Sequence, residues 1–424
     1  MSSLKPPSPP PSTPPSFKPR TTYPHLPGLT RGRCVHVEAR QAGVRYSIQN
    51  EAGITSVETA AENDAKLGDI VEYEAGQIRV LTTSHRAPTW NSRILDPRRL
   101  HGTRIRSQVE NAIRDYFLKQ DFHETRTPLL VPCPGMETHI RTYQTTTGAH
   151  LPTSPEFAMK RLLVGGLEKI FQLCPAFRHE PESTTHHPEF MMLEWYRAYA
   201  GYEEIMQDTE SLFEFIALKL FGKPSLQFQG QEISVKTPWP RLQVRDLFLG
   251  HAGVNLLEAS TPELLRAECV RLGLAPSDTD TWDDLYFRIW LNLIEPALPG
   301  HQAVFVTRYP PSQAALAVVD QDADGSSWAR RFELYVGGLE LGNAFEELTD
   351  PFEQRRRFVA DMKAREMIYG ADFPKTPLDE EFLQALEEAM PPSGGIAVGV
   401  DRMVMLFANE PDIEKTLWLK SFSP

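Results

Sequence analysis

FQLCPAFRHEPESTTHHPEFMMLEWY, the stretch from Phe171 to Tyr196, consists of two apolar segments that flank a loop rich in Ser, Thr, His and Pro. Apolar segments on either side of such a loop predict two strands of an antiparallel hairpin. Arg178 stands where the first strand enters the loop, and arginine offers a planar fork of donors that suits a phosphate or a carboxylate. Glu194 interrupts the second apolar segment, where a carboxylate is costly to bury without a cationic partner. These residues alone indicate either a binding site or a surface loop with a structural Arg–Glu pair.

Three segments, in the order and at the distances that the family requires, resemble the three motifs of the class II aminoacyl-tRNA synthetases of the lysyl branch. Residues 171–196 resemble motif 2, with its Phe-Arg-x-Glu signature and its Glu-x-Tyr ending. DFHETRTPLL, residues 121–130, resembles motif 1, and Pro128 is its proline. GGIAVGVDRMVML, residues 394–406, resembles motif 3, and Arg402 is its arginine. The resemblance implies an α+β fold in which helices flank an antiparallel sheet.

Four further segments, TSPEFAMKRLLVGG, FQLCPAFR, LEWYRAY and YPPSQAALA, resemble a group of lysyl-tRNA synthetase paralogues that lack the full anticodon-binding domain. That resemblance implies an ATP-dependent enzyme that activates (R)-β-lysine or lysine and transfers it to a lysine side chain of elongation factor P. Ala397 favours this group, because lysyl-tRNA synthetases usually carry glycine at that position. A lysyl-tRNA ligase and a non-catalytic lysine-binding regulatory protein are the alternatives. The retained Arg178 and Arg402 argue against the second of these.

The composition of the 424 residues is typical of a cytoplasmic enzyme. No apolar segment approaches the ~18 residues that a membrane-spanning helix needs, and no apolar region near the N-terminus indicates a secretory signal. The four cysteines are far apart, which argues against a zinc site or a disulfide framework and indicates a reducing compartment. A wide nucleic-acid surface is normally basic, so the formal net charge of −12 argues against extensive tRNA binding.

The sequence predicts three parts. Residues 1–29, rich in proline, are predicted to form a disordered, extended tail. Residues 30–88 contain five short segments with partial alternation, RCVHVEA, VRYSIQN, ITSVETA, DIVEYEA and QIRVLTT, which predict a small OB-like β-barrel. This barrel is either a relic of the anticodon-binding domain or a structural or partner-docking module. Residues 94–424 are predicted to form the catalytic domain.

Within the catalytic domain, residues 103–120 carry apolar side chains at four-residue spacing, which predicts an amphipathic helix leading into a strand after Pro128. In the family that the chain resembles, this region forms the subunit interface, which implies a homodimer. An ordinary core helix and strand is the alternative. Residues 203–222 and 262–273 predict two more amphipathic helices, which we expect to belong to an insertion that caps the pocket.

The resemblance places seven residues around the amino acid: Ser154, Pro155, Glu156, Glu194, Tyr196, Asn343 and Glu347. Taken alone, Glu156 in the first turn of a predicted helix would stabilise the helix dipole. In the lysyl branch the glutamate at this position holds the α-amino group of the substrate. We expect no Lys or Arg here that could neutralise an acidic substrate side chain, and the three glutamates of the pocket would repel one another unless the ligand carries two ammonium groups. A diamino acid, lysine or its β-isomer, meets that requirement.

The resemblance also places ten residues around ATP: Arg178, His179, Glu180, His186, His187, Phe190, Glu340, Leu341, Gly399 and Arg402. Arg178 would bridge the attacking carboxylate and the α-phosphate, and Arg402 would contact the distal phosphate, so these two are the expected catalytic residues. Glu180 would hold the adenine amino group, and Phe190 would stack on the adenine ring. His187 stands where the family usually has asparagine. A metal-binding histidine pair is the alternative, but neighbours along a strand point to opposite faces.

Glu333 and Glu340 flank a strand-like segment that two glycines interrupt. Mg²⁺ prefers carboxylate and phosphate oxygens, and the resemblance implies that both glutamates are ligands of the Mg²⁺ that accompanies ATP. Two solvated charges at a strand edge are the alternative. ATP and Mg²⁺ are therefore the predicted cofactors.

Overall fold

The computed structural model describes residues 28–41, 43–60, 63–370 and 376–420. The chain forms two compact units, Met1–Asp96 and Pro97–Pro424. Nearly all of the predicted proline-rich tail, residues 1–27, lies outside the described residues.

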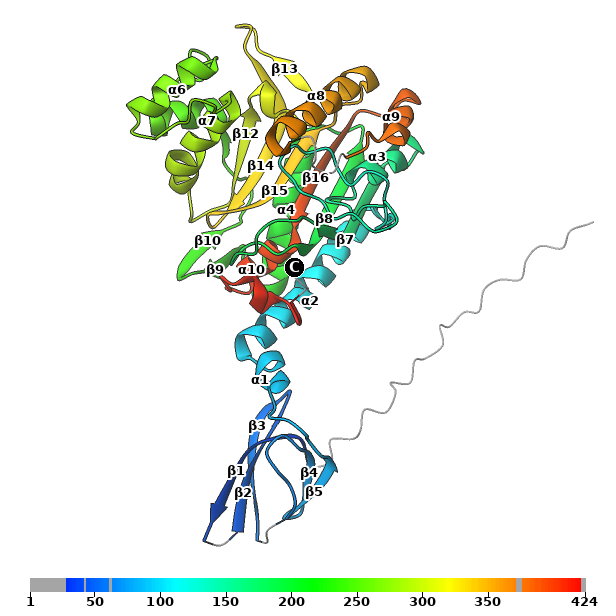
Figure 1. Ribbon diagram of the computed structural model, residues 1–424, viewed down its shortest axis with the longest axis vertical. Coiled ribbons are helices and arrows are strands. Elements are labelled where there is room, and N and C mark those ends of the chain that lie inside the picture. The colour runs from blue at the N-terminus through cyan, green and yellow to red at the C-terminus, as the bar shows by residue number, and fades with distance from the viewer. Residues whose placement is uncertain (1–27, 42, 61–62, 371–375, 421–424) are drawn as a thin grey trace, which may run out of the picture. The chain divides into compact units, whose positions relative to one another are not determined.

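The first unit contains an antiparallel sheet of five strands (Figure 1). The strands are β1 (Thr30–Arg40), β2 (Gly43–Asn50), β3 (Gly53–Thr59), β4 (Ile70–Glu74) and β5 (Gln77–Thr82), and each coincides with one of the five predicted segments. Cys34, Tyr46, Ile48 and Val71 form its small core. The order β3-β2-β1-β4-β5 agrees with an OB-like module, with β3 and β5 at the two edges of the described sheet. A short helix, α1 (Trp90–Ile94), follows.

The second unit is built on a large sheet whose order is β11-β12-β14-β15-β16-β8-β7-β6, with β13 paired to β14. The pairs β6/β7 and β11/β12 are parallel, and the other pairs are antiparallel. The hairpin predicted for residues 171–196 is confirmed as β7 and β8. The strands are β6 (His123–Glu124), β7 (Lys169–Phe177), β8 (Glu189–Ala198), β11 (Arg241–Gln243), β12 (Val304–Tyr309), β13 (Val319–Gln321), β14 (Ser327–Val336), β15 (Leu339–Glu346) and β16 (Ser393–Gly399), with β9 (Ser225–Phe228) and β10 (Gln231–Ser234) as a separate hairpin.

The helices of the second unit include the three that the sequence predicts, which are α2, α4 and α6 of those named below. None of the helices in the described part of the chain is both long and apolar enough to cross a bilayer. The α-helices are α2 (Pro97–Lys119), α3 (Glu156–Val164), α4 (Tyr202–Phe221), α5 (Val244–Leu247), α6 (Pro262–Arg271), α7 (Trp282–Ile289), α8 (Pro351–Tyr369), α9 (Glu380–Glu387) and α10 (Val400–Phe407).

The prediction of a strand after Pro128 is wrong. The strand β6 ends at Glu124, and residues 125–130 form no strand. Pro128, Pro132 and Pro134 all fall in the segment that follows β6, and proline cannot donate a hydrogen bond to a strand ladder. The chain therefore leaves the sheet here and becomes a loop.

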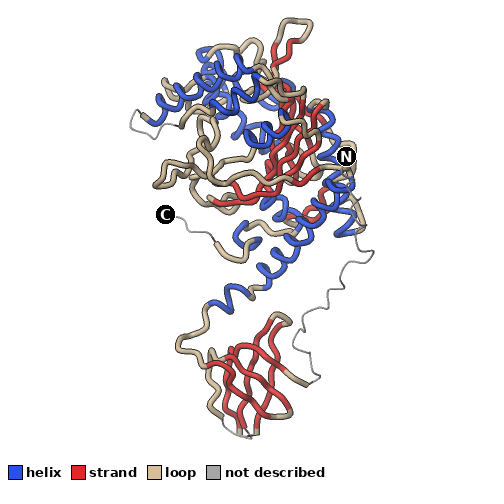
Figure 2. The backbone as a smooth tube through the Cα atoms, turned by 90° about the vertical axis from the view of Figure 1, so that its right-hand side faces the viewer, coloured by secondary structure: helices blue, strands red, loops and turns tan. Residues whose placement is uncertain are grey.

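One face of the large sheet packs on α2, α4 and α10 (Figure 1; Figure 2). Successive side chains of a strand point to opposite faces, so every second residue of β8 and β16, among them Leu193, Trp195, Ile396 and Val398, enters this core. We expected residues 203–222 to belong to a capping insertion, and this was wrong. They form α4, whose apolar stripe is buried in the same core as these strand residues.

Two smaller cores lie outside this layer. Phe157 of α3 stacks on Phe382 of α9, and Phe358 of α8 packs beside both rings. The helices α5, α6 and α7 share a separate core with Val304 and Val306 of β12. The helices α6 and α7 thus lie at the β12 end of the sheet, while α9 contacts both α3 and α8, and α3 also contacts β8 (Figure 1).

All four cysteines are free thiols and are buried: Cys34, Cys133, Cys174 and Cys269. Burial raises the pKa of the Cys133 thiol and that of the Cys174 thiol to about 12. These side chains therefore behave as small apolar residues of the core.

Asp401, at the first turn of α10, joins three elements of the second unit. It is 2% exposed, and its Oδ2 accepts a 2.6 Å hydrogen bond from the backbone nitrogen of Met191 in β8. Its Oδ1 accepts a hydrogen bond from Arg106 of α2, and Arg106 also donates to the carbonyl oxygen of Thr416. A buried carboxylate with these partners ties the sheet, α2 and α10 together.

We predict that Asp401→Ala lowers the free energy of unfolding by about 3–5 kcal/mol, because it removes the buried carboxylate that pairs with Arg106 and accepts from a strand N–H. Urea unfolding followed by circular dichroism measures this loss. The matched control is Glu232→Ala, which breaks an exposed pair with Lys223 and should leave the midpoint unchanged. Equal stabilities of the two variants would contradict the role given to Asp401.

Candidate active site

In-register residues of five strands form a row across the sheet. The row runs from Glu333 of β14 through Asn343, Ala397 and Glu194 to Gln172 of β7. Residues directly opposite each other in a sheet point to the same face. Because Leu193 and Trp195 face the core of α2, α4 and α10, Glu194 and the rest of the row face the other way. The residues expected around Mg²⁺ and around the amino acid thus share one face.

A second row on the same face contains Gly395 between Phe345 and Tyr196. A Cβ atom at Gly395 would lie 2.3 Å from the Tyr196 ring and 2.5 Å from Oε1 of Glu347. These distances are far below van der Waals contact. Glycine at this position therefore leaves the space that the Tyr196 ring and the Glu347 carboxylate occupy.

The expected amino-acid pocket is assembled around Glu194, which is fully buried. Its Oε1 accepts a 2.5 Å hydrogen bond from Ser154, and its Oε2 accepts a 2.9 Å hydrogen bond from the Tyr196 hydroxyl. Ser154 Oγ also accepts from the backbone nitrogen of Glu156, at the start of α3 directly after Pro155. Burial and then the nearby Glu156 carboxylate raise the pKa of Glu194 to about 8.

A basic residue that the sequence analysis did not place in this pocket lies between its acids. Lys160 of α3 is fully buried, and its Nζ lies 2.6 Å from Oε1 of Glu156 and 2.6 Å from Oε2 of Glu347. Burial alone would lower the pKa of Lys160, but the two carboxylates raise it above its usual value. Burial raises the pKa of Glu347 to about 8, against the opposing effect of Lys160. One ammonium group of the protein therefore already neutralises part of the acidic charge.

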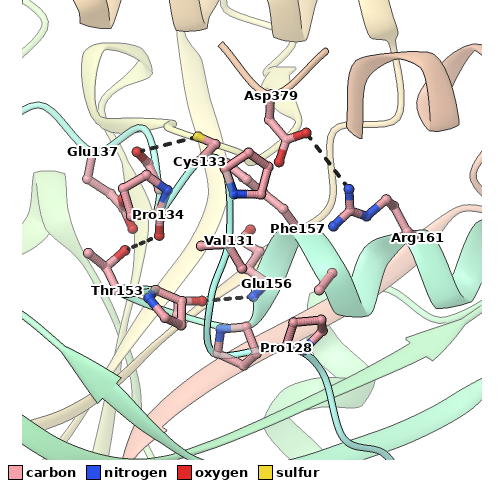
Figure 3. Close-up of a pocket in the computed structure, with 16 residues that line it drawn as sticks. Pro128, Val131, Cys133, Pro134, Glu137, Thr153, Glu156, Phe157, Arg161 and Asp379 are labelled. Atoms are coloured by element: carbon pink, nitrogen blue, oxygen red, sulfur yellow. Dashed lines mark hydrogen bonds and ion pairs between the residues drawn. The ribbon is translucent and has the colours of Figure 1, made fainter. Parts of the chain in front are cut away.

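A cavity adjoins this pocket, between residues 128–137 and the start of α3 (Figure 3). Its wall includes Glu156, Glu137 and Asp379, and Arg161 lies 3.9 Å from the Asp379 carboxylate. Burial raises the pKa of Glu137. The segment that forms no strand after β6 thus lines a cavity beside the amino-acid pocket.

Arg178 follows directly after β7. Its guanidinium carbon lies 5.2 Å from the centre of the Phe190 ring, within the range of a cation–π contact. Its Nε is buried and has no hydrogen-bond partner among the described residues. A buried donor of this kind is normally satisfied, and a ligand carboxylate or phosphate would satisfy it. Phe190, expected to stack on adenine, therefore also supports the arginine.

Arg402 of α10 connects the loop between β7 and β8 to β15. It donates to the carbonyl oxygen of Glu340 at 2.8 Å and to that of Thr185 at 3.2 Å, and its Nη2 lies 2.6 Å from Nε2 of His186. Burial and then the Arg402 charge lower the pKa of His186. Arg178, directly after β7, and Arg402, in α10, are the two expected catalytic arginines, and both lie near Glu340.

The other residues expected around ATP lie along the same loop and strands. His179 is exposed with its ring 5.0 Å from that of Tyr143, and Glu180 is partly exposed. His187 is buried, and its Nδ1 lies 2.8 Å from the carbonyl oxygen of Glu189, whereas His186 is exposed. Leu341 and Gly399 can face the site only through their backbones. The side chain of Leu341 lies in the core, and its carbonyl oxygen would be 3.8 Å from a Cβ atom at Gly399.

Burial and then the nearby charge of Glu333 raise the pKa of Glu340 to about 7. Two adjacent carboxylates of this kind fit a divalent cation, since Mg²⁺ completes its shell with water and phosphate oxygens. Glu333 is held by Arg331 at 2.6 Å and by the Tyr335 hydroxyl at 2.8 Å. Arg331 also donates to Oδ1 of Asn343 at 3.0 Å. Among the described residues, no group of three or more His, Cys, Asp or Glu side chains forms a metal cluster.

Comparison with known proteins agrees with this arrangement. Residues 91–420 match the family described as tRNA synthetases class II (D, K and N). The chain belongs to this family. It is similar to the lysine–tRNA ligase of Pelotomaculum thermopropionicum, at 30% identity over 94% of this chain and 84% of the relative. It is also similar to those of Agrobacterium fabrum and Thermosipho africanus, at 38% and 35% identity, over 74% and 75% of this chain and 62% of each relative.

Three residues of this class II synthetase site were missed in the sequence. Lys160 stands four residues after Glu156, the spacing at which opposite charges pair on a helix. Arg331 stands two residues before Glu333, so alternation places both side chains on the same face of β14. Glu137 lies in the segment wrongly expected to be a strand, and no spacing signal marked it.

We predict that the stability of this class II synthetase falls as the pH rises from about 5 to about 9. Glu194 has an ordinary pKa of about 4.3 in the unfolded chain and a raised one in the fold. Between these values the folded state binds more protons, so the free energy of unfolding decreases as the pH rises through the folded pKa. Denaturant unfolding at a series of pH values measures the slope.

Glu194→Gln should flatten this slope, because the group that titrates is removed. Glu189→Gln is the matched control, since Glu189 is an exposed acid on the same strand. A wild-type slope that Glu194→Gln leaves unchanged would show that Glu194 does not titrate in this range.

Proposed function

We propose that this chain is an ATP-dependent ligase that activates (R)-β-lysine or lysine as an adenylate and transfers it to a lysine side chain of elongation factor P. The single observation that carries the first half is the shared sheet face. Glu194 and Glu347 lie there in an acidic pocket, and Arg178 and Arg402 lie beside Glu340. A site with buried carboxylates on one side and two guanidinium groups on the other suits a diamino acid beside a triphosphate.

In the first step, an oxygen of the substrate carboxylate attacks the α-phosphorus of ATP and the bond to pyrophosphate breaks. The two reactants are both anionic, so the protein contributes mainly positioning and positive charge. Arg178 would bridge the carboxylate and the α-phosphate, and its unpartnered Nε is available for that contact. Arg402 would contact the distal phosphate. Glu180 would hold the adenine amino group, with the ring on Phe190.

The acids of the pocket would select the amino acid. Glu156 would hold the α-amino group near Ser154, and Glu347 with Tyr196 would take the second ammonium group. Sites built to hydrogen-bond a substrate reject analogues that lack the group by about 10⁴–10⁵. Asn343 and Ala397 would form the floor beside Glu194, because the three are neighbours in one row.

Glu333 and Glu340 would hold Mg²⁺, with Arg331 and Tyr335 fixing the orientation of Glu333. When bound, Mg²⁺ would neutralise part of the phosphate charge. Arg402 keeps the backbone of Glu340 in place through its bond to the carbonyl oxygen.

In the second step, a neutral amine attacks the carbonyl carbon of the adenylate, an amide bond forms and AMP leaves. The amine must lose its proton, so this step should accelerate towards the pKa of lysine, about 10.4. The quoted segments that resemble the paralogue group, the alanine at position 397 and the net charge of −12 support elongation factor P as the acceptor. A homodimer through α2 and the segment after it is supported by the exposed side chains of Leu129 and Leu130.

A lysyl-tRNA ligase is the second candidate. It is favoured by the similar proteins, each of which is named a lysine–tRNA ligase. Both candidates share the adenylate step and differ in the acceptor.

The test is ATP–pyrophosphate exchange with lysine or (R)-β-lysine, followed by transfer assays with elongation factor P and with tRNA. We expect exchange with at least one of the two isomers and transfer to elongation factor P alone. Arg178→Lys keeps the charge but loses the planar fork, and should lower the exchange rate by about 10²–10³. Arg197→Lys is the matched control, because Arg197 lies on the same hairpin and pairs with Asp208 outside the site.

Transfer to tRNA alone would replace the first candidate by the second. Absence of exchange with both isomers would reject both candidates and leave a non-catalytic lysine-binding protein.

A further inference from the structure

Lys160 is unusual because its whole side chain, including the ammonium group, is buried. Its Nζ bridges two carboxylates, that of Glu156 in the same helix and that of Glu347, which follows β15. The ammonium group also lies 6.0 Å from the ring centre of Phe382 in α9. The bridge therefore connects helix α3 to the strand layer at the bottom of the amino-acid pocket.

A buried ion pair is costly in free energy, and an apolar side chain of similar size often stabilises a fold at least as well. Phe157 and Phe382 stack at 4.7 Å beside the lysine, so apolar surroundings for a methionine are already present. Packing alone therefore does not explain an ammonium group at this position. The explanation lies in the carboxylates that it contacts.

Lys160 contacts Oε1 of Glu156 and Oε2 of Glu347, so Oε1 of Glu347 remains for a further donor. Oε1 of Glu347 is buried and has no hydrogen-bond partner among the described residues. This oxygen faces Gly395, beside the Tyr196 ring. A buried acceptor without a partner points to a donor supplied by a ligand.

The charge of the pocket follows from the same contacts. Glu156, Glu194 and Glu347 together with Lys160 carry a net charge of minus two when all are ionised. That charge balances two ammonium groups of a ligand whose carboxylate is bound elsewhere. Without Lys160 the three acids would exceed the charge of a diamino acid.

We propose that Lys160 is a positioning residue that fixes Glu156 and Glu347 for the two ammonium groups of the substrate and matches the charge of the pocket to a diamino acid. This rests on the proposed function, in which the same pocket activates lysine or its β-isomer. Lys160 contacts no substrate itself. It acts through the two glutamates.

The test compares Lys160→Met with wild type in ATP–pyrophosphate exchange, after thermal unfolding has shown that the variant folds. We expect the KM for the amino acid to rise by about 100-fold, because two substrate ligands lose their shared partner. The KM for ATP should change by less than about threefold, since ATP lies on the arginine side of the site. Lys219→Met, which removes an exposed lysine paired with Asp115, should change neither value.

The pH profile separates this role from simple support of the fold. Removing the ammonium group should move the acidic limb of kcat/KM for the amino acid to higher pH, because the carboxylates lose a stabilising charge. The ionisable groups around this position are Glu156, Glu194, Tyr196 and Glu347. Lys160→Arg keeps the cation and should keep the wild-type profile.

Should the methionine variant not fold, Lys160→Gln gives the same comparison, because its amide still donates hydrogen bonds but carries no charge. Equal increases in the KM for the amino acid and for ATP, with an unmoved pH profile, would show that Lys160 only supports the fold. Unchanged KM values would also overturn the proposal. If wild-type protein activates neither isomer, the proposed function fails, whereas isothermal titration with lysine still reports whether Lys160 controls diamino-acid binding.

Discussion

The register of the antiparallel strands is the constraint on which the site depends. One row places Glu333, Asn343, Ala397 and Glu194 side by side, and a second row places Gly395 beside Tyr196. A shift of one residue in any of these strands would turn its polar side chains into the core of α2, α4 and α10. The apolar residues that alternate with them, such as Trp195, hold the register because they have no other place to be buried. The same alternation therefore forms the core on one face and the site on the other.

This arrangement concentrates carboxylates where burial disfavours their charged form. The pKa of Glu194 and that of Glu347 are raised to about 8, and that of Glu340 to about 7. Buried acids with raised pKa values are typical of binding sites, where preorganised contacts with a ligand lower the stability of the fold. Lys160 and Arg331 reduce the free-energy cost of burying these acids. Lys160 pairs with two carboxylates and Arg331 with one, and each pair has a fixed orientation. Neither residue contacts the solvent freely, so both act as internal counter-ions.

Much of the fold could be predicted because its signals are local. The hairpin of β7 and β8 and the five strands of the first unit follow from alternation and turn residues. The strand expected after Pro128 failed because prolines interrupt its ladder, and α4 was misplaced because a helix pattern does not say which core it joins. The pocket glutamates were predicted from the resemblance to the lysyl branch, because no local pattern marks a residue as part of a pocket. Lys160 was missed because its role depends on Glu347, which is 187 positions away in sequence and meets it only in the fold.

Because all four cysteines are buried, none of them presents a reactive thiol at the protein surface. With thiol pKa values of about 12 at Cys133 and Cys174, almost no thiolate is present at neutral pH, and the thiolate is the form that reacts with maleimides. A single cysteine introduced at an exposed position such as Glu189 would then be labelled selectively. A fluorophore attached there would report on motions of the hairpin loop without first removing the native sulfur atoms.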